Sequence, residues 1–209
     1  MDHSLPAGLK SPEVRVTPFT FPGPALPVWL AATPRRAGAK ESLLAALWRR
    51  LALQEGLPAG RCPTLHQDHL GRPYLLTAPA SAAISFSHCQ GHTWAALARS
   101  RRLGLDVASP LEFRPPYPYG RAFRAAELQL LREAMEDSLP VLAALLWALK
   151  EASVKVLGCG FHLFDPLTVV VGRPRRLHQG WLFQVRAVQP VPVYARPQGD
   201  GWMALACLG

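Results

Sequence analysis

The stretch that decides the fold is Trp147-Ala148-Leu149-Lys150-Glu151-Ala152-Ser153-Val154-Lys155. It lies within an apolar segment, residues 141–157, which predicts a helix that ends at Gly158 and Gly160. Apolar residues recur along it at helical spacing and predict one side that faces the core: Leu142, Leu145, Leu149, Ala152 and Val156. Glu151 and Lys155 then lie on the opposite side, one turn apart. Such a pair is either an ordinary solvated ion pair or part of a functional site.

This helix and a later segment both have counterparts in the first half of the chain. Residues 91–98 and 199–206 share the pattern G-x-x-W-x-A-L-A, and an apolar helical block precedes each of them, at 42–48 and 141–147. The same order in both halves indicates two tandem similar lobes. We therefore expect an α+β fold in which each lobe is a small, mostly antiparallel sheet packed on a long helix. The predicted lobes are residues 1–103 and residues 104–209.

Hydrophobic periodicity predicts the remaining elements. Helices are expected at 39–53 and 122–134, and strands at 25–31, 84–87, 94–98, 102–107, 167–171, 181–188 and 202–208. Three prolines between Phe113 and Tyr119 predict a linker without regular structure.

Composition narrows the class of protein. The net charge is +9, with 19 Arg and 4 Lys spread along the chain, which favours an anionic partner: nucleic acid, a phosphorylated small molecule or an acidic protein. The sequence has no signature of a nucleic-acid-binding motif, and no apolar run reaches the ~20 residues of a membrane span. The N-terminus does not resemble a signal peptide, and the four cysteines are scattered, so we expect a cytoplasmic protein without disulfides.

Three further segments could carry chemistry. Asp106 lies on the predicted strand at 102–107 and is the only charged residue between Leu103 and Ser109, so it either caps a strand end or binds a partner such as a metal ion. His88 follows Ser87 at a strand end, where both could donate hydrogen bonds to a phosphate. Arg72 lies in the turn Gly71-Arg72-Pro73 and presents one guanidinium group.

Taken together and in this order, these segments resemble the 4′-phosphopantetheinyl transferase superfamily, most closely its larger class of two tandem lobes. The family pattern is G-K/R-P, S-H-S, G-I/L-D-x-E, F-x-x-x-E and W-x-x-K-E-A-x-x-K. Its counterparts in this chain are Gly71–Pro73, Ser87–Cys89, Gly104–Ala108, Phe123–Glu127 and Trp147–Lys155. The last segment matches in full and is the most specific.

The resemblance implies a reaction and a set of roles. The 4′-phosphopantetheine group of coenzyme A would be transferred to a serine of an acidic apo acyl carrier protein, with Mg²⁺ or Mn²⁺ as cofactor. Asp106 and Glu151 would bind the metal, and Lys155 would stabilise the diphosphate. Glu151, or a metal-bound water beside it, would accept the serine proton. The residues expected to bind coenzyme A are Arg72, Ser87, His88, Lys150, Lys155 and either Lys40 or Arg36. A chain with both lobes would be a monomer.

The sequence also departs from the family pattern. Ala108 stands where the family has a second metal carboxylate, so a water or another acid such as Glu127 would have to replace it, with weaker metal binding as the result. Cys89 replaces a serine, and Glu41 aligns with a basic residue. These departures leave open an alternative, a catalytically silent relative that still binds coenzyme A or a carrier protein.

Overall fold

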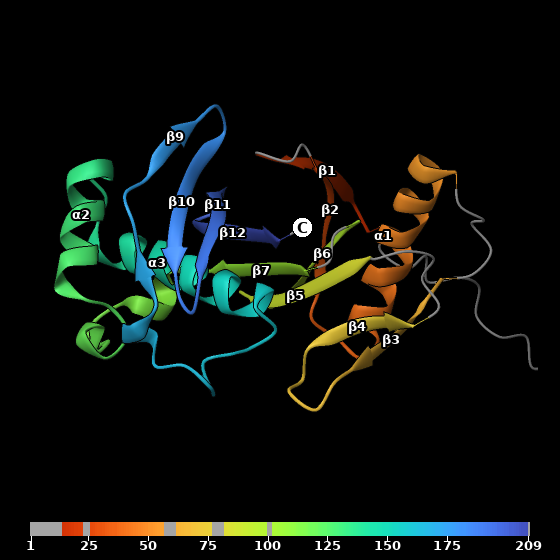
Figure 1. Cartoon of the computed structure of the whole chain (residues 1–209), viewed down its shortest axis with the longest axis horizontal. Coiled ribbons are helices and arrows are strands. Elements are labelled where there is room, and N and C mark those ends of the chain that lie inside the picture. The colour runs from red at the N-terminus through yellow and green to blue at the C-terminus, as the bar shows by residue number, and fades with distance from the viewer. Residues whose placement is uncertain (1–13, 23–25, 57–61, 77–81, 100–101, 209) are drawn as a thin grey trace, which may run out of the picture.

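A computed structural model describes residues 14–22, 26–56, 62–76, 82–99 and 102–208 of the 209-residue chain. The chain forms two antiparallel sheets, each with a long helix against one face, and the two sheets meet near the middle of the molecule (Figure 1). This confirms the α+β class. Within the described residues, no helix is both long enough and apolar enough to cross a lipid bilayer.

The first sheet has the strand order β1-β2-β6-β5. Its strands are β1 (Val16–Phe21), β2 (Leu26–Pro34), β5 (Ala83–Cys89) and β6 (His92–Ala98), and helix α1 (Ala39–Glu55) packs against one face. The apolar side of α1, which includes Leu43, Leu47 and Leu51, is buried against this sheet. A separate hairpin, β3 (Thr64–Gln67) and β4 (Pro73–Leu76), lies between α1 and β5 in the sequence.

The second sheet has the order β7-β12-β11-β10-β8, with β9 paired to β10. Its strands are β7 (Arg102–Ala108), β8 (Val170–Val171), β9 (Arg175–Leu177), β10 (Gly180–Arg186), β11 (Pro190–Gln198) and β12 (Gly201–Leu208). Helix α3 (Leu139–Val156) packs on β7 and β12, and α2 (Ala125–Met135) packs on α3. Short 3₁₀ helices cover Pro110–Phe113, Tyr119–Arg121 and Pro166–Thr168.

The two sheets share a strand order. In the first, β6 lies between β2 and β5, and in the second, β12 lies between β7 and β11. In both cases the long helix follows the first of the three strands in the sequence. This is the arrangement that two duplicated lobes would have, although the duplication and the lobe boundary stay predictions.

Parts of the prediction from sequence are wrong. Segment 113–119 is not a free linker, because Phe113 is buried and packs with Trp147 of α3. The strand expected at 167–171 is a 3₁₀ helix followed by the two-residue strand β8. Strands β1, β3, β4, β9 and β11 were not predicted.

Side chains hold the two sheets together where β5 runs beside β7. The backbone amides of Leu105 and Val107 donate to the hydroxyls of Ser85 (2.9 Å) and Ser87 (3.1 Å). These hydrogen bonds replace part of the backbone pairing that a continuous sheet would have, so the two strands approach each other without forming one ladder. We call this contact the seam, and the candidate site lies on it.

Candidate functional site

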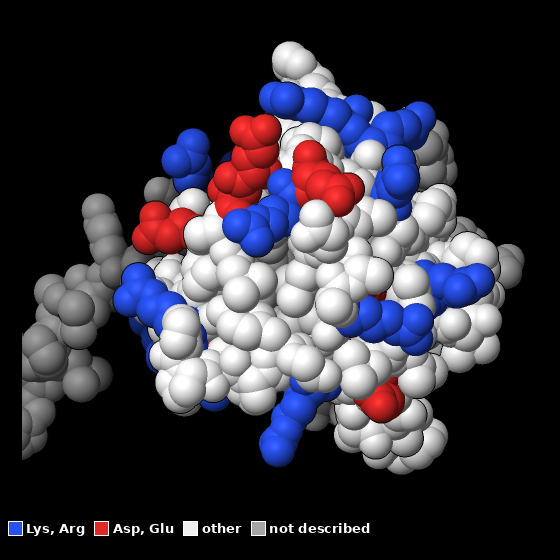
Figure 2. All heavy atoms as spheres, turned by 90° about the vertical axis from the view of Figure 1, so that its left-hand side faces the viewer, with Lys and Arg blue, Asp and Glu red and all other residues white. Residues whose placement is uncertain are grey.

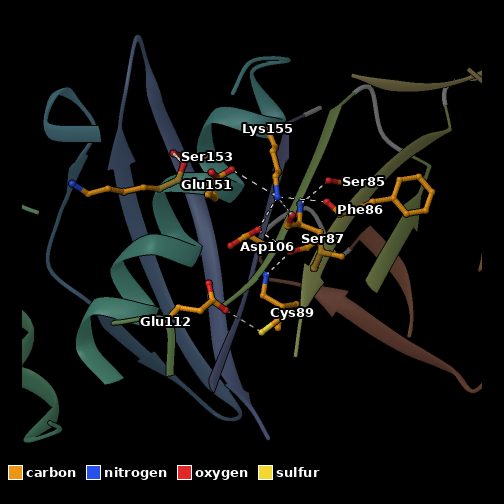
Figure 3. Close-up of polar contacts among 12 residues, drawn as sticks. Ser85, Phe86, Ser87, Cys89, Asp106, Glu112, Glu151, Ser153 and Lys155 are labelled. Carbon is orange, nitrogen blue, oxygen red and sulfur yellow. Dashed lines mark hydrogen bonds and ion pairs between the residues drawn. The ribbon is translucent and has the colours of Figure 1, made fainter. Parts of the chain in front are cut away.

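Asp106 lies at the centre of the seam, on β7, with only 5% of its surface exposed. Its Oδ1 accepts hydrogen bonds from the Ser87 hydroxyl (2.8 Å) and from the Lys155 ammonium (2.7 Å), as Figure 3 shows. A carboxylate in an apolar strand requires such partners, because burying it alone is costly. Asp106 is therefore fixed in place beside a cation.

A glycine on the same strand lets α3 approach this carboxylate. A Cβ at Gly104 would lie 2.1 Å from the carbonyl oxygen of Ala152 and 2.8 Å from the amide nitrogen of Val156, which is closer than real Cβ atoms come. Glycine is therefore required here for the helix to lie directly on β7. This packing places Glu151 and Lys155 over Asp106.

Lys155 joins the two acids. Its ammonium nitrogen lies 2.7 Å from Asp106 Oδ1 and 3.8 Å from Glu151 Oε2, and it also donates to the carbonyl oxygen of Leu105 at 3.1 Å. The two carboxylate oxygens are thus separated by no more than the sum of those two ion-pair distances. The structure therefore brings the carboxylates of residues 106 and 151 together around Lys155, and their role as metal ligands stays a prediction.

The charges of this cluster shift its protonation equilibria. Burial raises the pKa of Glu151, and the nearby Asp106 raises it further, although Lys155 opposes both effects. Burial on its own would lower the pKa of Lys155, but Asp106 and then Glu151 outweigh it, so the pKa of Lys155 is raised. The lysine therefore stays cationic, and Glu151 is easier to protonate than an exposed glutamate.

A cavity of about 220 Å³ opens beside this cluster. We call it the cationic cavity, because Lys40, Arg72, His88 and Lys155 line it together with Glu151. Burial lowers the pKa of His88, and Lys40, Arg35 and Lys155 lower it further, which shows that several positive charges act on one imidazole. Such a concentration of donors and cations suits a phosphorylated ligand.

Arg72 reaches this cavity from the turn between β3 and β4. Asp68 fixes the turn, because its Oδ1 accepts from the amides of Leu70 and Arg72, both at 2.9 Å. The guanidinium group lies against Gly158, where a Cβ would come within 2.9 Å of Nη1. Arg72 is thus placed by a turn on one side and by a glycine of the opposite loop on the other.

The structure brings some predicted coenzyme-binding residues to the cavity and not others. Lys40 lines it, whereas Arg36 lies on the exposed turn before α1 and does not. Ser87 is buried and uses its hydroxyl on Asp106 and Val107, so it positions the carboxylate and does not line the cavity. The prediction that Ser87 contacts a phosphate is therefore not supported by the geometry.

The structure contradicts the predicted role of Lys150. Its side chain is fully buried, and its ammonium donates to Glu127 Oε2 (2.8 Å), the carbonyl of Pro166 (2.9 Å) and the carbonyl of Ala122 (3.1 Å). All three N–H groups are used, and the side chain points toward α2, away from the cationic cavity. The expectation that Lys150 binds coenzyme A is wrong.

The same ion pair rules out Glu127 as a replacement for the missing carboxylate at position 108. Glu127 is 3% exposed, and its other oxygen accepts from the amide of Val171 at 2.8 Å. Among the described residues, no three His, Cys, Asp or Glu side chains gather in a way that could hold a metal ion. Asp106 and Glu151 remain as the two acids of the site.

Cys89 and Ala108 mark the end of the seam beyond Asp106. The Cys89 thiol donates to Glu112 Oε1 at 3.6 Å. Burial raises the pKa of Cys89 to about 12, and the charges of Glu112 and Asp106 contribute. The thiol is therefore neutral and unreactive, and it behaves as a small polar group in place of the serine of the family pattern.

Sequence analysis missed two parts of the site. Ser85 supports β7 from within a segment that the strand prediction treated as ordinary alternation. The loop after α3 lines the cationic cavity through Gly158, Cys159, Gly160 and His162. The two glycines of this loop predicted only the end of the helix, and their role in making room for Arg72 and His162 depends on the fold.

Comparison with known proteins agrees with this geometry. Residues 102–206, just over half of the 209-residue chain, match the model of the 4′-phosphopantetheinyl transferase superfamily. No curated protein gives a significant match to the chain. The matched segment begins at β7 and contains Asp106, α3 and the second sheet except for the last two residues of β12. The chain therefore belongs to the 4′-phosphopantetheinyl transferase superfamily.

Proposed function

We propose that this protein transfers the 4′-phosphopantetheine group from coenzyme A to a serine of an apo acyl or peptidyl carrier protein and releases adenosine 3′,5′-bisphosphate. The observation that carries the proposal is the convergence of Asp106, Glu151 and Lys155 beside the cationic cavity. Family membership supports phosphopantetheine transfer in general. The cofactor, the acceptor and the residue roles below are the proposal.

The carboxylates of Asp106 and Glu151, which lie beside the cationic cavity, fit a divalent cation. Mg²⁺ prefers oxygen ligands and keeps several waters, so Asp106 and Glu151 with phosphate oxygens are a sufficient set. The raised pKa of Glu151 supports this, because a buried acid next to another acid gains stability from an added cation. Bound Mg²⁺ or Mn²⁺ would neutralise charge on the diphosphate as the bond breaks.

The remaining steps use the chain's own groups. The serine oxygen of the carrier attacks the β-phosphorus, the bond from that phosphorus to the bridging oxygen breaks, and adenosine 3′,5′-bisphosphate leaves with the bonding electrons. Glu151 accepts the serine proton, for which burial and its raised pKa suit it. Lys155 donates to the oxygens that gain charge. Lys40, Arg72 and His88 hold the nucleotide phosphates.

The proposal also covers the two lobes, the oligomeric state, the location and the partner protein. The shared strand order of the two sheets supports tandem lobes, with the site between residues 1–103 and residues 104–209. Because one chain contributes both sides of the seam, we propose that the protein is a monomer. The four free cysteines support the proposal that it is cytoplasmic. The net charge of +9 suits an acidic carrier protein. Figure 2 shows that Lys and Arg are dispersed over the face that carries α2 and are not gathered in one patch.

Ala108 favours a second candidate, a relative that binds coenzyme A or a carrier protein without transferring the group. Its methyl group is buried where the family pattern has a metal carboxylate. The two candidates differ in one measurement. The purified protein is incubated with an apo carrier protein, coenzyme A and Mg²⁺, and the carrier is weighed by mass spectrometry. A gain of one phosphopantetheine group supports the enzyme, and coenzyme A binding without any gain supports the silent relative.

Substitutions of the two acids test the site itself. Asp106→Ala and Glu151→Gln should each lower turnover by about 10³-fold, because each removes charge from the centre of the reaction. Glu133→Gln is the matched control, since Glu133 lies on the exposed side of α2. Circular dichroism should show that all three variants are folded. Near-normal turnover in either acid variant would refute the proposed centre.

A further inference from the structure

A cavity of about 270 Å³ lies where β1 and β2 of the first sheet face β11 and β12 of the second. Its lining includes Arg15, Thr17, Leu30, Ala31, Arg196 and Met203. We call it the arginine cavity. None of the described residues lines both this cavity and the cationic cavity, and the roles assigned above leave the arginine cavity without a ligand.

Aromatic rings hold Arg196 at this cavity. Its guanidinium carbon lies 5.7 Å from the ring centroid of Phe19 on β1, and Phe19 packs against Tyr194 with 4.8 Å between the ring centroids. A guanidinium over the face of a ring is attracted to it, and its N–H groups lie in the guanidinium plane, where they stay available at the edge. Arg196 is therefore placed by contacts that join the two sheets before any ligand binds.

The charge of Arg196 has no counter-ion in the described part of the chain. Neither Arg196 nor Arg15 forms an ion pair with an Asp or Glu there. The Nε atom of Arg196 is buried and has no acceptor among the same residues. A buried N–H without an acceptor is unfavourable, and an oxyanion would supply a charge-assisted hydrogen bond to it. This unsatisfied donor indicates an anionic ligand.

The arginine cavity is also the counterpart of the acidic centre, with the opposite charge. By strand order, β2 and β11 correspond to β7 and β5. Ser87 and Arg196 each lie two residues before the last residue of their strand, which is followed by a two-residue turn in both hairpins. Counted from the same turns, Asp106 and Ala31 pair with equivalent residues of β12 and β6. A hydroxyl and a carboxylate are thus replaced by a guanidinium and a methyl group, so this site suits an anion and not a metal ion.

The rest of the wall favours a ligand with an apolar body. Leu30 and Met203 are buried in the core between the two sheets and contribute apolar surface. Thr17, which is exposed, adds a hydroxyl, and none of the described lining residues is Asp or Glu. The volume is below the roughly 300 Å³ at which typical ligand pockets begin, so only a small ligand fits.

We infer that the arginine cavity binds a small organic carboxylate, with its charged end on Arg196 and Arg15 and its apolar part against Leu30 and Met203. A carboxylate accepts two parallel hydrogen bonds from one guanidinium. Inorganic phosphate would also meet the arginines, but it would place charged oxygens against an apolar wall, which is costly. The bound ligand would join β1 to β11, and this binding does not require the transfer reaction.

The probes are octanoate, acetate and inorganic phosphate, each titrated into the purified full-length protein by isothermal titration calorimetry. We expect octanoate to bind and acetate to bind at least tenfold more weakly, because acetate lacks the part that covers Leu30 and Met203. Saturating adenosine 3′,5′-bisphosphate should not displace octanoate, since the two cavities are lined by different residues.

Arginine variants locate the octanoate. Arg196→Met should weaken octanoate binding at least tenfold, and Arg15→Met should weaken it less, because Arg15 is exposed and solvent screens its charge. Arg186→Met removes an exposed arginine of β10 and is the matched control, which should bind octanoate as the wild type does. If Arg196→Met does not fold, Arg196→Lys keeps the charge but loses the planar fork, and it should weaken binding in the same direction.

The other results overturn the inference. Equal octanoate affinity in the wild type and in a folded Arg196 variant would do so, as would a wild type that does not bind octanoate. Phosphate that binds more tightly than octanoate would make this a phosphate site, and displacement of octanoate by adenosine 3′,5′-bisphosphate would place octanoate in the cationic cavity. A protein that binds octanoate as expected but does not transfer phosphopantetheine would contradict the proposed function alone.

Discussion

Helix α3 carries two lysines, five positions apart, and each is paired with a carboxylate from another element. Lys150 pairs with Glu127 at 2.8 Å, and the two side chains are 0% and 3% exposed. Lys155 pairs with Asp106 at 2.7 Å, but 26% of the lysine side chain is exposed, and it lines the cationic cavity. Distance does not distinguish these pairs. Access to a ligand does.

Both ammonium groups have three acceptors, so the two pairs differ in their carboxylates and in what surrounds them. The Lys150 ammonium has three acceptors and Glu127 accepts from two backbone amides besides the lysine, which leaves this pair with no capacity for a ligand. Lys155 is held between two acids and faces a cavity with further cations. A closed pair fixes α2 on α3, whereas an open pair can exchange partners when a phosphate arrives. The difference separates a structural lysine from a candidate catalytic one.

The largest expected effect concerns the closed pair. Lys150→Met should lower the free energy of unfolding by about 3–5 kcal/mol, because it leaves the carboxylate of Glu127 buried without its cation. Lys155→Met is the matched comparison and should cost less, about 2 kcal/mol, because Ser87 still donates to the buried Asp106 and Glu151 lines the cationic cavity. Urea unfolding of both variants measures the difference. Equal losses would show that the two pairs are not distinct in the way described.

The variant with the smaller loss of stability, Lys155→Met, should show the larger loss of turnover. Lys155→Met should lower turnover by about 10²-fold, equivalent to ~2.7 kcal/mol, because it removes a charge that stabilises the breaking bond. Lys150→Met, assayed at a temperature at which it is folded, should keep turnover within a few-fold of the wild type. A Lys155→Met protein that loses stability but not activity would make this pair an ordinary ion pair.

This comparison also shows what the sequence could predict. The helical period correctly predicted the core side of α3, because that pattern depends only on spacing along one helix. It could not distinguish Lys150 from Lys155, since the difference depends on which element covers each side chain. Lys150 and Glu151 are neighbours in the sequence, but on a helix they point in different directions, one toward α2 and the other toward β7.

The strands that were missed have physical causes as well. Strand β11 contains Pro190, Pro192 and Pro197, and proline normally argues against an internal strand because it has no N–H to donate. It nevertheless lies between β10 and β12, and Val191, Val193 and Ala195 bury its alternating side. Tertiary packing thus overrides the local signal. Likewise, the role of Ser85 and Ser87 in joining two strands cannot be seen until β5 and β7 lie side by side.

The smallest expected effect concerns His88, which lines the cationic cavity together with Lys155 of the open pair. Burial and then the charges of Lys40, Arg35 and Lys155 lower the pKa of His88 in the free protein, so its imidazole is mostly neutral at about pH 6.5–8. A bound phosphate would raise that pKa, because it favours the charged form. Binding then takes up a proton, and affinity rises as the pH falls from about 8 to about 6.5.

Titration of adenosine 3′,5′-bisphosphate at several pH values checks this linkage. We expect the wild-type affinity to increase by a few-fold over that range and the pH dependence to be flat in His88→Gln. His178→Gln is the matched control, because His178 lies on the exposed turn between β9 and β10 and should keep the wild-type profile. If His88→Gln retains the full pH dependence, the imidazole does not contact the phosphate. The phosphate would then be bound in the cationic cavity by Lys40, Arg72 and Lys155, and Lys155 would still differ from Lys150 in its access to the ligand.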